Sequence, residues 1–453
     1  MKFVLKNGLV LFSLCILMSC KTEKPTESND RPNIVLILSD DQAWGDYSFM
    51  GHEIVQTPNL DRLASESVVF KRGYVPTAIC RPSLMTLVTG LYPHQHNITG
   101  NDPAGGFREA RYPREDLLAN IDSLAKLPAL LGEAGYLSHQ SGKWWEGHYS
   151  RGGFTDGMTQ GRRHGDEGLT IGREGMQPIY NFIDTAQAQE KPFFVWYAPF
   201  LPHTPHTPPE RLLSKYTAMD LPLTIAKYYA MIEWFDETCG DLVNYLDDNN
   251  LRENTLIYYL CDNGWIQKPD KNGFDVRSKQ SPMEGGVRTP ILFSWPGQLA
   301  PAERSEFISS IDLFPTILEA AGVSSPGPRP GLNLWANLKQ GTPIERDIIF
   351  GEGYGHNMMD NNDPEASLAY RWCIQKPWKL ILCYDGELEG YGPDTHADMR
   401  TEAIRLYNII EDPDETTNLA GQQPEVVQRL RTAIEDWYPL EKRKVLASSD
   451  GND

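Results

Sequence analysis

Short runs of consecutive apolar residues, separated by helical patterns, constrain the fold of this chain most strongly. The first run covers residues 33–38, and similar runs follow at 192–197, 255–260 and 290–295. Runs without polar alternation are typical of strands that are buried on both faces, as in a parallel sheet. Helical patterns such as residues 226–246 lie between the runs. The alternation predicts an α/β fold with a mostly parallel central sheet flanked by helices.

The pattern of the chain changes after about residue 345. Residues 32–345 carry the alternating strand and helix patterns and are predicted to form the main domain. Residues 346–453 are predicted to form a small C-terminal α+β subdomain with antiparallel strands and a terminal helix. These strands and the helix are expected at residues 370–374, 378–383, 405–408 and 424–438.

Cys373 and Cys383 flank a predicted turn at Lys376-Pro377. In an oxidising compartment, cysteines in neighbouring strands can form a disulfide. Two unpaired cysteines in adjacent strands are an equally good interpretation of the same pattern, so both alternatives stay open at this point.

The first 20 residues have the features of a targeting segment. Lys2 and Lys6 supply a positive start, and the apolar run that follows is too short to span a bilayer as an ordinary helix. The run ends in a segment that resembles a bacterial lipobox, in which Cys20 would be lipidated and become the mature N-terminus. Residues 21–31 would then be a flexible tether. We expect a lipid-anchored protein of the bacterial envelope, facing the periplasm or the cell exterior, with plain secretion as the alternative.

The formal net charge of −19 restricts the possible partners. It argues against nucleic acid and against an anionic membrane surface as general partners, so membrane contact is expected through the lipid only. An anionic substrate would be repelled by the overall field. If the chain acts on such a substrate, a local basic pocket must overcome that repulsion.

Acidic residues follow two of the predicted buried strands. Asp40 and Asp41 come directly after the run at 33–38, and Asp262 and Asn263 follow the run at 255–260. Neighbouring carboxylates repel each other unless a cation neutralises them. Oxygen ligands from carboxylates and amides suit Ca²⁺ or Mg²⁺. Each pair alone is compatible with a solvated turn, but together they predict a metal site at the ends of two strands.

Cys80 opens a segment whose apolar spacing is partly helical. The cysteine is therefore expected at the start of a helix, where the dipole and the free N–H groups favour negative charge. Basic residues occur in three further motifs. They are Lys143 in the sequence Gly-Lys-Trp, His203 and His206 in a proline-rich loop, and Lys279 ahead of the segment Glu-Gly-Gly-Val-Arg.

In this order along the chain, the motifs resemble those of the type I sulfatases, a family with the alkaline-phosphatase-like fold. The resemblance extends from about Pro32 to about Tyr438. It implies that Cys80 is oxidised after synthesis to formylglycine, whose hydrated aldehyde attacks sulfur. It further implies a formylglycine-generating maturation enzyme as a partner and a sulfated carbohydrate as the substrate.

The resemblance also implies roles for individual residues. One Ca²⁺ ion would be bound by Asp40, Asp41, Asp262, Asn263 and an oxygen of the modified Cys80. Lys143 and Lys279 would bind sulfate oxygens, and His203 would contact the sulfate and protonate the leaving oxygen. His206 would be a substrate-side or structural residue.

Two positions depart from the family pattern. Leu84 stands where the family usually has an arginine, and Trp145 stands where it often has a histidine. Arg81 is expected to replace part of the missing positive charge and to contact the substrate. The histidine role is expected to be filled by His148, to be vacant, or to be performed differently.

A glycine-rich insertion at residues 152–175 contains the basic cluster Arg162-Arg163-His164. We expect Arg162 and Arg163 to contact a further anionic group of the substrate, such as a uronate or a second sulfate, because such loops carry specificity. A solvated charged loop is an equally good interpretation. For the whole chain, the alternatives are a phosphodiesterase or phosphonate hydrolase of the same superfamily and an inactive glycan-binding lipoprotein.

Overall fold

The structure, a computed structural model, describes residues 1, 31–106, 110, 112–389 and 399–447. Residues 31–453 form one compact unit. The predicted signal segment after Met1, the lipidation site at Cys20 and all of the predicted tether except Arg31 lie outside the described residues. Among the helices that are described, none is long and apolar enough to cross a bilayer.

The central sheet has nine strands, with the order β10-β2-β8-β7-β1-β6-β4-β5 and β9 paired to β2. The predicted buried runs form its middle. β1 (Asn33–Ser39) lies between β7 (Thr255–Cys261) and β6 (Phe193–Ala198), and β4 (Leu137–Gly142) lies beyond β6. All of these neighbours run parallel. The prediction of a mostly parallel central sheet is confirmed.

β8 (Arg288–Ser294) runs antiparallel to both of its neighbours, β7 and β2 (Val68–Tyr74). Between β7 and β8 the chain does not cross the sheet through a long helix. It forms loops and the short helix α9 (Glu284–Val287), and then re-enters the sheet beside β7. Because the connection stays at one edge, Lys279 remains close to the end of β7.

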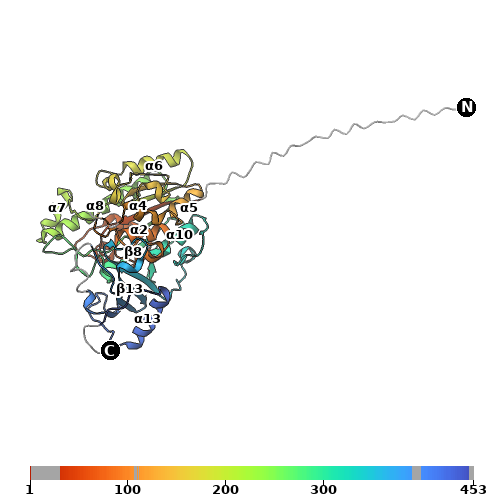
Figure 1. Cartoon of the computed structure of the whole chain (residues 1–453). Helices are drawn as coiled ribbons and strands as arrows, with labels where there is room; N and C mark the ends of the chain where they lie inside the picture. Colours follow the sequence, from red (N-terminus) through yellow and green to blue (C-terminus); the bar gives the residue numbers. More distant parts are fainter. Residues whose placement is uncertain (2–30, 107–109, 111, 390–398, 448–453) are drawn as a thin grey trace. The chain divides into compact units, whose positions relative to one another are not determined.

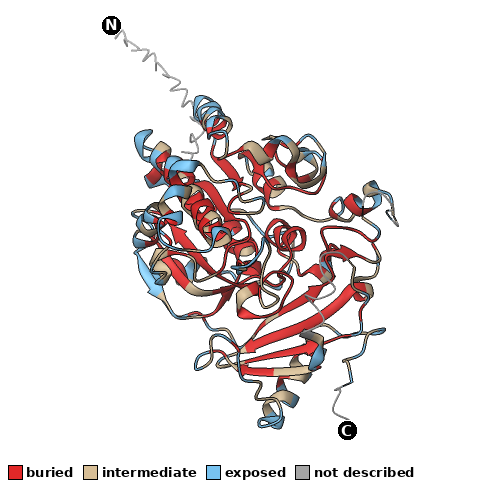
Figure 2. Ribbon diagram, turned by 90° about the vertical axis from the view of Figure 1, so that its left-hand side faces the viewer, coloured by how far each residue is buried: buried red, intermediate tan, exposed pale blue. Residues whose placement is uncertain are grey.

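Both faces of the central sheet are covered, and Figure 2 shows its strands as buried almost throughout. Side chains alternate along β1, so that Ile34 and Leu36 join one core cluster while Val35 and Ile37 join another. The first face packs against α2 (Cys80–Thr89), α5 (Leu127–Glu133) and α10 (Leu313–Ala320). The second face packs against α1 (Pro58–Ser65), α6 (Gln177–Ala188) and α8 (Leu223–Asp248).

A second sheet of four antiparallel strands follows, in the order β11-β13-β14-β15. Leu430 and Ile434 of the terminal helix α13 pack against this sheet, and the helix lies beside it in Figure 1. The predicted antiparallel strands and terminal helix are therefore confirmed. Their bounds are β11 (Ile349–Tyr354), β13 (Leu368–Gln375), β14 (Trp378–Cys383), β15 (Ile404–Asn408) and α13 (Pro424–Trp437).

Shorter elements complete the described part of the fold. The remaining strands are β3 (Asp102–Pro103), β5 (Asp156–Gly157), β9 (Ala302–Arg304), β10 (Ile308–Ser309) and β12 (Asn357–Met358), of which β3 and β12 pair with each other. The remaining α-helices are α3 (Pro93–His96), α4 (Arg114–Leu118), α7 (Glu210–Thr217) and α11 (Trp335–Gln340).

The register of the second sheet decides between the two interpretations of Cys373 and Cys383. Across β13 and β14, Cys373 lies opposite Leu380 and Cys383 lies opposite Tyr370. A cross-strand disulfide needs the two cysteines opposite each other at a short Cα distance. The disulfide alternative is therefore wrong, and the structure contains no bond between these cysteines.

A buried ion cluster joins the second sheet to the central one. Lys379 of β14 is fully buried, and its Nζ lies 3.1 Å from Glu284 Oε1 and 2.9 Å from Glu415 Oε1. Glu284 belongs to α9, directly before β8. These buried charges need such close pairing, because the desolvation free energy of each unpaired ion would be unfavourable and uncompensated.

Lys379→Met should therefore destabilise the protein by about 3–5 kcal/mol, because it leaves Glu415 buried without its cation and Glu284 with only Arg288 at 3.7 Å. Thermal or denaturant unfolding measures this loss. Lys191→Met is the control, since Lys191 is exposed, and its effect should stay within about 0.5 kcal/mol. Equal stability of the two variants would contradict a structural role for the cluster.

Candidate active site

The carboxyl ends of the parallel strands bring the predicted site residues together. Asp40 and Asp41 follow β1, and Asp262 follows β7. Backbone hydrogen bonds hold these ends in register, with the Asp262 N–H donating to the Ser39 carbonyl at 3.0 Å. Ligands in open α/β sheets bind at this edge, because several chain segments leave the sheet there side by side.

Lys143 reaches the same place from the end of β4. Gly142 before it has a φ of +85°, and a Cβ at this position would lie 1.7 Å from the Ala198 carbonyl oxygen. Only glycine allows such a close approach. The Lys143 N–H then donates to that carbonyl at 2.7 Å, which directs the lysine side chain toward Asp40.

Helix α2 begins at Cys80, as the sequence predicts, and presents it to the acidic strand ends. Ligand atoms of Cys80, Asp40, Asp41 and His203 all lie within 4.8 Å of one another. The Ser83 hydroxyl donates to the Asp262 carbonyl at 2.7 Å and fixes the helix against β7. Burial, partly opposed by Lys143 and Lys279, raises the pKa of the Cys80 thiol to about 12. The unmodified side chain is therefore a neutral thiol and a weak nucleophile.

The acidic residues form a donor set that fits a hard cation. Asp40 Oδ2 and Asn263 Oδ1 are buried and have no hydrogen-bond partner among the described residues. The Asn263 amide nitrogen donates to Asp41 Oδ1 at 2.7 Å. Burial, reinforced by repulsion from Asp262 and Asp41, raises the pKa of Asp40 despite Lys143. Oxygen atoms without partners beside mutually repelling carboxylates are the chemistry that Ca²⁺ or Mg²⁺ satisfies.

Two buried lysines border the acidic residues. Lys143 Nζ lies 2.6 Å from Asp40 Oδ1, and Lys279 Nζ lies 2.7 Å from Asp41 Oδ2. Burial disfavours the Lys143 ammonium, but the neighbouring anions, first Asp40, outweigh this and hold its pKa above the ordinary value. The same balance, with Asp41 as the main anion, raises the pKa of Lys279. Both side chains stay cationic, but they face the three carboxylates of Asp40, Asp41 and Asp262. A divalent cation held by these carboxylates would make the site positive, as an anionic substrate requires.

His203 lies between these groups on the loop after β6. Its Nε2 is 3.3 Å from Asp41 Oδ2, and its Nδ1 donates to the Thr204 carbonyl. Burial and the charges of Lys143 and Lys279 hold the pKa of His203 well below its usual value. Because Nδ1 is occupied by the loop backbone, Nε2 is the nitrogen that faces the site.

A cleft of about 500 Å³ opens beside this cluster. Its walls include His203, Lys279, Gln280, Trp265, His164 and His356. The first two of these residues belong to the buried cluster, so a substituent bound there would continue into the cleft. Aromatic side chains in its wall, such as Trp265, are suited to contact the faces of sugar rings.

His164 enters this cleft although the sequence analysis assigned it no role. It lies in the short helix η4 (Arg163–Thr170) with a φ of +73°. Its ring packs against Trp145 at 4.5 Å and lies 5.5 Å from the ring of His203, measured between centroids. Burial and the nearby Lys143 and His203 lower its pKa. Its only sequence signal was its place in the basic cluster, because the left-handed backbone that turns it inward is invisible in a pattern.

His148 does not join the site. It is exposed and caps the short helix η3 (Tyr149–Gly152), with Nδ1 2.9 Å from the Ser150 hydroxyl. The expectation that His148 fills the histidine role is therefore corrected, since His164 occupies the space beside Trp145. His206 lies against the rings of Tyr228 and Trp265 at the rim, which agrees with the structural half of its expectation.

Arg81 faces away from the acidic cluster. Its guanidinium donates to Glu146 at 2.6 and 2.8 Å and to the Leu117 carbonyl at 3.0 Å, and both ionic partners are buried. Its charge is thus balanced by Glu146, so the expected contact of Arg81 with the substrate is corrected. Leu84 is fully buried in the core of the first sheet face. Lys143 and Lys279, rather than Arg81, carry the positive charges of the site.

The arginines of the basic cluster in the insertion also lie differently from the expectation. Arg163 lines the cleft, but it forms two hydrogen bonds to Asp102, one of them at 2.8 Å. Arg162 is exposed and is not among the residues that line the cleft. Arg163 is paired with Asp102 and Arg162 lies outside the cleft lining, so the expected contact of both arginines with a second anionic group is corrected.

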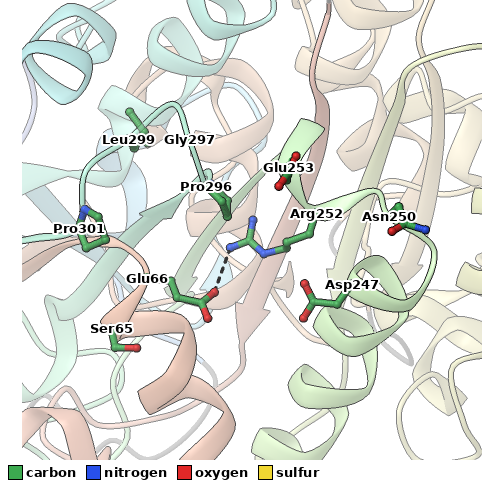
Figure 3. A pocket seen from close by; sticks show the side chains of 10 residues that line it. All are labelled: Ser65, Glu66, Asp247, Asn250, Arg252, Glu253, Pro296, Gly297, Leu299 and Pro301. Atoms are coloured by element: carbon green, nitrogen blue, oxygen red, sulfur yellow. Dashed lines mark ion pairs between the residues drawn. The ribbon is translucent and has the colours of Figure 1, made fainter.

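A larger hollow of about 670 Å³ lies elsewhere in the fold (Figure 3). Its walls include Asp247 and Arg252, which precede β7, and Glu66, which precedes β2, so the hollow lies at the opposite edge of these strands. Arg252 pairs with Glu66 at 3.7 Å. This hollow contains none of the predicted site residues, so the smaller cleft is the candidate active site.

The pairing of Arg81 with Glu146 predicts a specific pattern of stability. Arg81→Met should destabilise the protein by about 3–5 kcal/mol, because Glu146 remains buried without its partner. Adding Glu146→Met should restore at least about 2 kcal/mol of this loss, since the two effects are coupled. Unfolding experiments on both variants test this. A single variant with wild-type stability would show that the arginine is not structural.

Comparison with known proteins supports the resemblance to the type I sulfatases. The chain matches the sulfatase family model over residues 32–323 and the model of the C-terminal region of N-sulphoglucosamine sulphohydrolase over residues 273–438. It is 31% identical to N-acetylgalactosamine-6-sulfatase of Canis lupus familiaris, with 89% of this chain and 85% of the relative covered.

Solved structures share the fold. The crystal structure of Ps i-CgsB matches with a TM-score of 0.71 and 24% identity, covering 90% of this chain and 92% of that protein. A protein solved with its substrate D-glucosamine-2-N,6-O-disulfate matches with a TM-score of 0.69 and 20% identity, covering 90% and 97%. Together with the site geometry and the family match over most of the length, these findings establish that the chain belongs to the type I sulfatase family of the alkaline-phosphatase-like superfamily and is a sulfuric ester hydrolase.

Proposed function

We propose that this protein hydrolyses sulfate esters of glycans, with Cys80 matured to formylglycine and one Ca²⁺ ion in the acidic cluster. The observation that carries the proposal is the convergence of Cys80, the acidic strand ends and two buried lysines within one small site. Inorganic sulfate and the free sugar hydroxyl would be the products.

The glycan part of the proposal is supported by the cleft and by the relatives. The cleft is large enough for a sugar residue, and its walls combine aromatic, neutral polar and basic side chains. N-acetylgalactosamine-6-sulfatase and the protein solved with D-glucosamine-2-N,6-O-disulfate act on sulfated amino sugars according to their names. The same chemistry is proposed here for a sulfated carbohydrate.

The chain's own residues fit a hard cation. Asp40, Asp41, Asp262 and Asn263 would hold Ca²⁺, because two of their oxygens lack any other partner among the described residues. When bound, the ion would polarise the sulfate and counter its negative charge. Lys143 and Lys279 would bind sulfate oxygens from either side, as donors fixed in place before the substrate arrives.

His203 would deliver the proton that the departing sugar oxygen needs from Nε2, and this requires the imidazolium form because Nδ1–H donates to the Thr204 carbonyl. The Asp41 carboxylate, 3.3 Å from Nε2, and the bound sulfate would favour this form against the burial that lowers the pKa of His203. Its Nδ1 is held by the Thr204 carbonyl, so Nε2 is oriented toward the reacting groups. His164, beside His203 and Trp145, would supply the second imidazole of the site. A neutral imidazole in this position can accept a proton when sulfate is released.

Maturation and location complete the proposal. Cys80 is buried with only 1% of its surface exposed. A maturation enzyme would therefore have to reach it before the chain folds. Lipid attachment at Cys20, proposed from the sequence, would place the enzyme on the bacterial envelope and leave the catalytic unit free in the surrounding medium.

A phosphodiesterase or phosphonate hydrolase activity is the second candidate, because the superfamily shares this site plan. The family match favours sulfate. Initial rates on matched sulfate and phosphate esters separate the two activities. An inactive glycan-binding protein is disfavoured by the complete set of acidic, lysine and histidine groups around Cys80.

Replacing Cys80 tests the proposed nucleophile. Cys80→Ala should lower sulfate release by about 10³-fold or more, because no other group at the site can take its place. Cys239→Ala, which removes another buried cysteine, should keep most of the activity. Mass spectrometry of the peptide with Cys80 should find the aldehyde in protein from a host with the maturation system. Full activity of Cys80→Ala, or only unmodified thiol in active protein, would refute the proposal.

A pair of histidine variants tests the role of His164. His164→Ala should lower kcat by about 10²-fold, in the range of a lost acid–base group. His148→Ala should stay within about twofold of the wild type, which corresponds to a barrier difference below about 0.5 kcal/mol. Steady-state kinetics on one sulfate ester measure both. The reverse order of effects would restore the role that the sequence suggested for His148.

A further inference from the structure

The side chain of Gln280 is an unexplained feature of the cleft wall. It lines the cleft directly after Lys279, and only 2% of its surface is exposed. Both atoms of its amide group, Nε2 and Oε1, are buried and have no hydrogen-bond partner among the described residues. Buried amides almost always have partners, so an unpaired one in a cleft calls for a ligand.

The backbone holds Gln280 in this position. Its N–H donates to the Ala78 carbonyl at 2.8 Å, close to Cys80 in the chain. Its φ of +64° lies in the left-handed region, which is uncommon for a residue other than glycine. An uncommon backbone conformation together with an unpaired side chain beside a reactive site is typical of a functional residue.

The charged side chains of the surrounding wall, Lys279 and Arg163, are each paired with a carboxylate. Arg163 is neutralised by Asp102. Asn101 accepts a hydrogen bond from the Arg81 N–H at 2.9 Å, and its amide nitrogen lies 3.3 Å from His356 Nε2. These groups are engaged with one another, whereas Gln280 offers both a donor and an acceptor.

We propose that Gln280 binds a neutral polar group of the sugar ring that carries the sulfate. The group is one that can donate and accept at once, which means a ring hydroxyl or an acetamido group. The inference rests on the proposed function and narrows it: the preferred substrate carries an uncharged group, rather than a second sulfate or a carboxylate, on the side that faces Gln280.

The stability of Gln280→Met separates this role from a structural one. Methionine keeps the approximate volume and removes the unpaired amide, so the melting temperature should stay equal or rise. Gln267→Met is the matched control. Gln267 is also buried, but its amide bonds to the Trp265 indole at 3.1 Å and to two carbonyls, so its melting temperature should fall. A fall at position 280 as large as that at 267 would overturn the proposal.

Binding gives a readout that does not need the matured nucleophile. In a Cys80→Ser background, adding Gln280→Met should weaken the affinity for a sulfated monosaccharide by about 10-fold or more, as expected for a lost hydrogen bond in a desolvated site. Calorimetry measures this change. The affinity for inorganic sulfate should fall by a smaller factor, because sulfate lacks the ring. Equal losses for both ligands would overturn the proposal.

Deoxygenated substrates complete the test with active enzyme. A series of sulfated monosaccharides is used, in which each hydroxyl or acetamido group is replaced by hydrogen in turn. One replacement should lower the wild-type kcat/KM by about 10-fold or more and have little further effect on Gln280→Met. If no member shows this coupling, the inference fails. Wild-type enzyme that hydrolyses neither these sugars nor a simple aryl sulfate would instead refute the proposed function.

Discussion

The burial of several carboxylates at the ends of β1 and β7 is the constraint on which the rest of the site depends. Asp40, Asp41 and Asp262 lie close together and away from water, where like charges repel strongly. Lys143 and Lys279 compensate them from two sides. Because burial and charge are balanced so closely, the acidic strand ends can hold a cation and the lysines can bind an anion in the same small volume.

The same principle of paired buried ions recurs away from the chemistry. Lys379 joins the two sheets through Glu284, and Arg81 joins helix α2 to the loop of Glu146. A buried pair contributes little when intact compared with apolar packing, but it is costly to break. The first pair therefore fixes how the two sheets meet, and the second fixes the helix that begins at Cys80.

The departures from the family pattern have a common geometric explanation. Trp145 occupies the space where a histidine would be expected, and the insertion returns His164 to the cleft from a different part of the chain. Leu84 lies in the apolar core, where a charged side chain would be unpaired. The two lysines carry the positive charges of the site instead. The chain thus places a second imidazole beside His203 with a residue from another segment.

The sequence by itself determined the parallel sheet, the second sheet, the helix that begins at Cys80 and the motifs around it, because these depend on apolar periodicity and on local residue order. It did not determine the roles of Arg81, His148, His164 or Gln280. Their side chains are directed by a buried ion pair, a helix cap and left-handed backbone turns. Such contacts join residues far apart in the chain or depend on single dihedral angles, so only the tertiary structure decides which polar groups face the cleft.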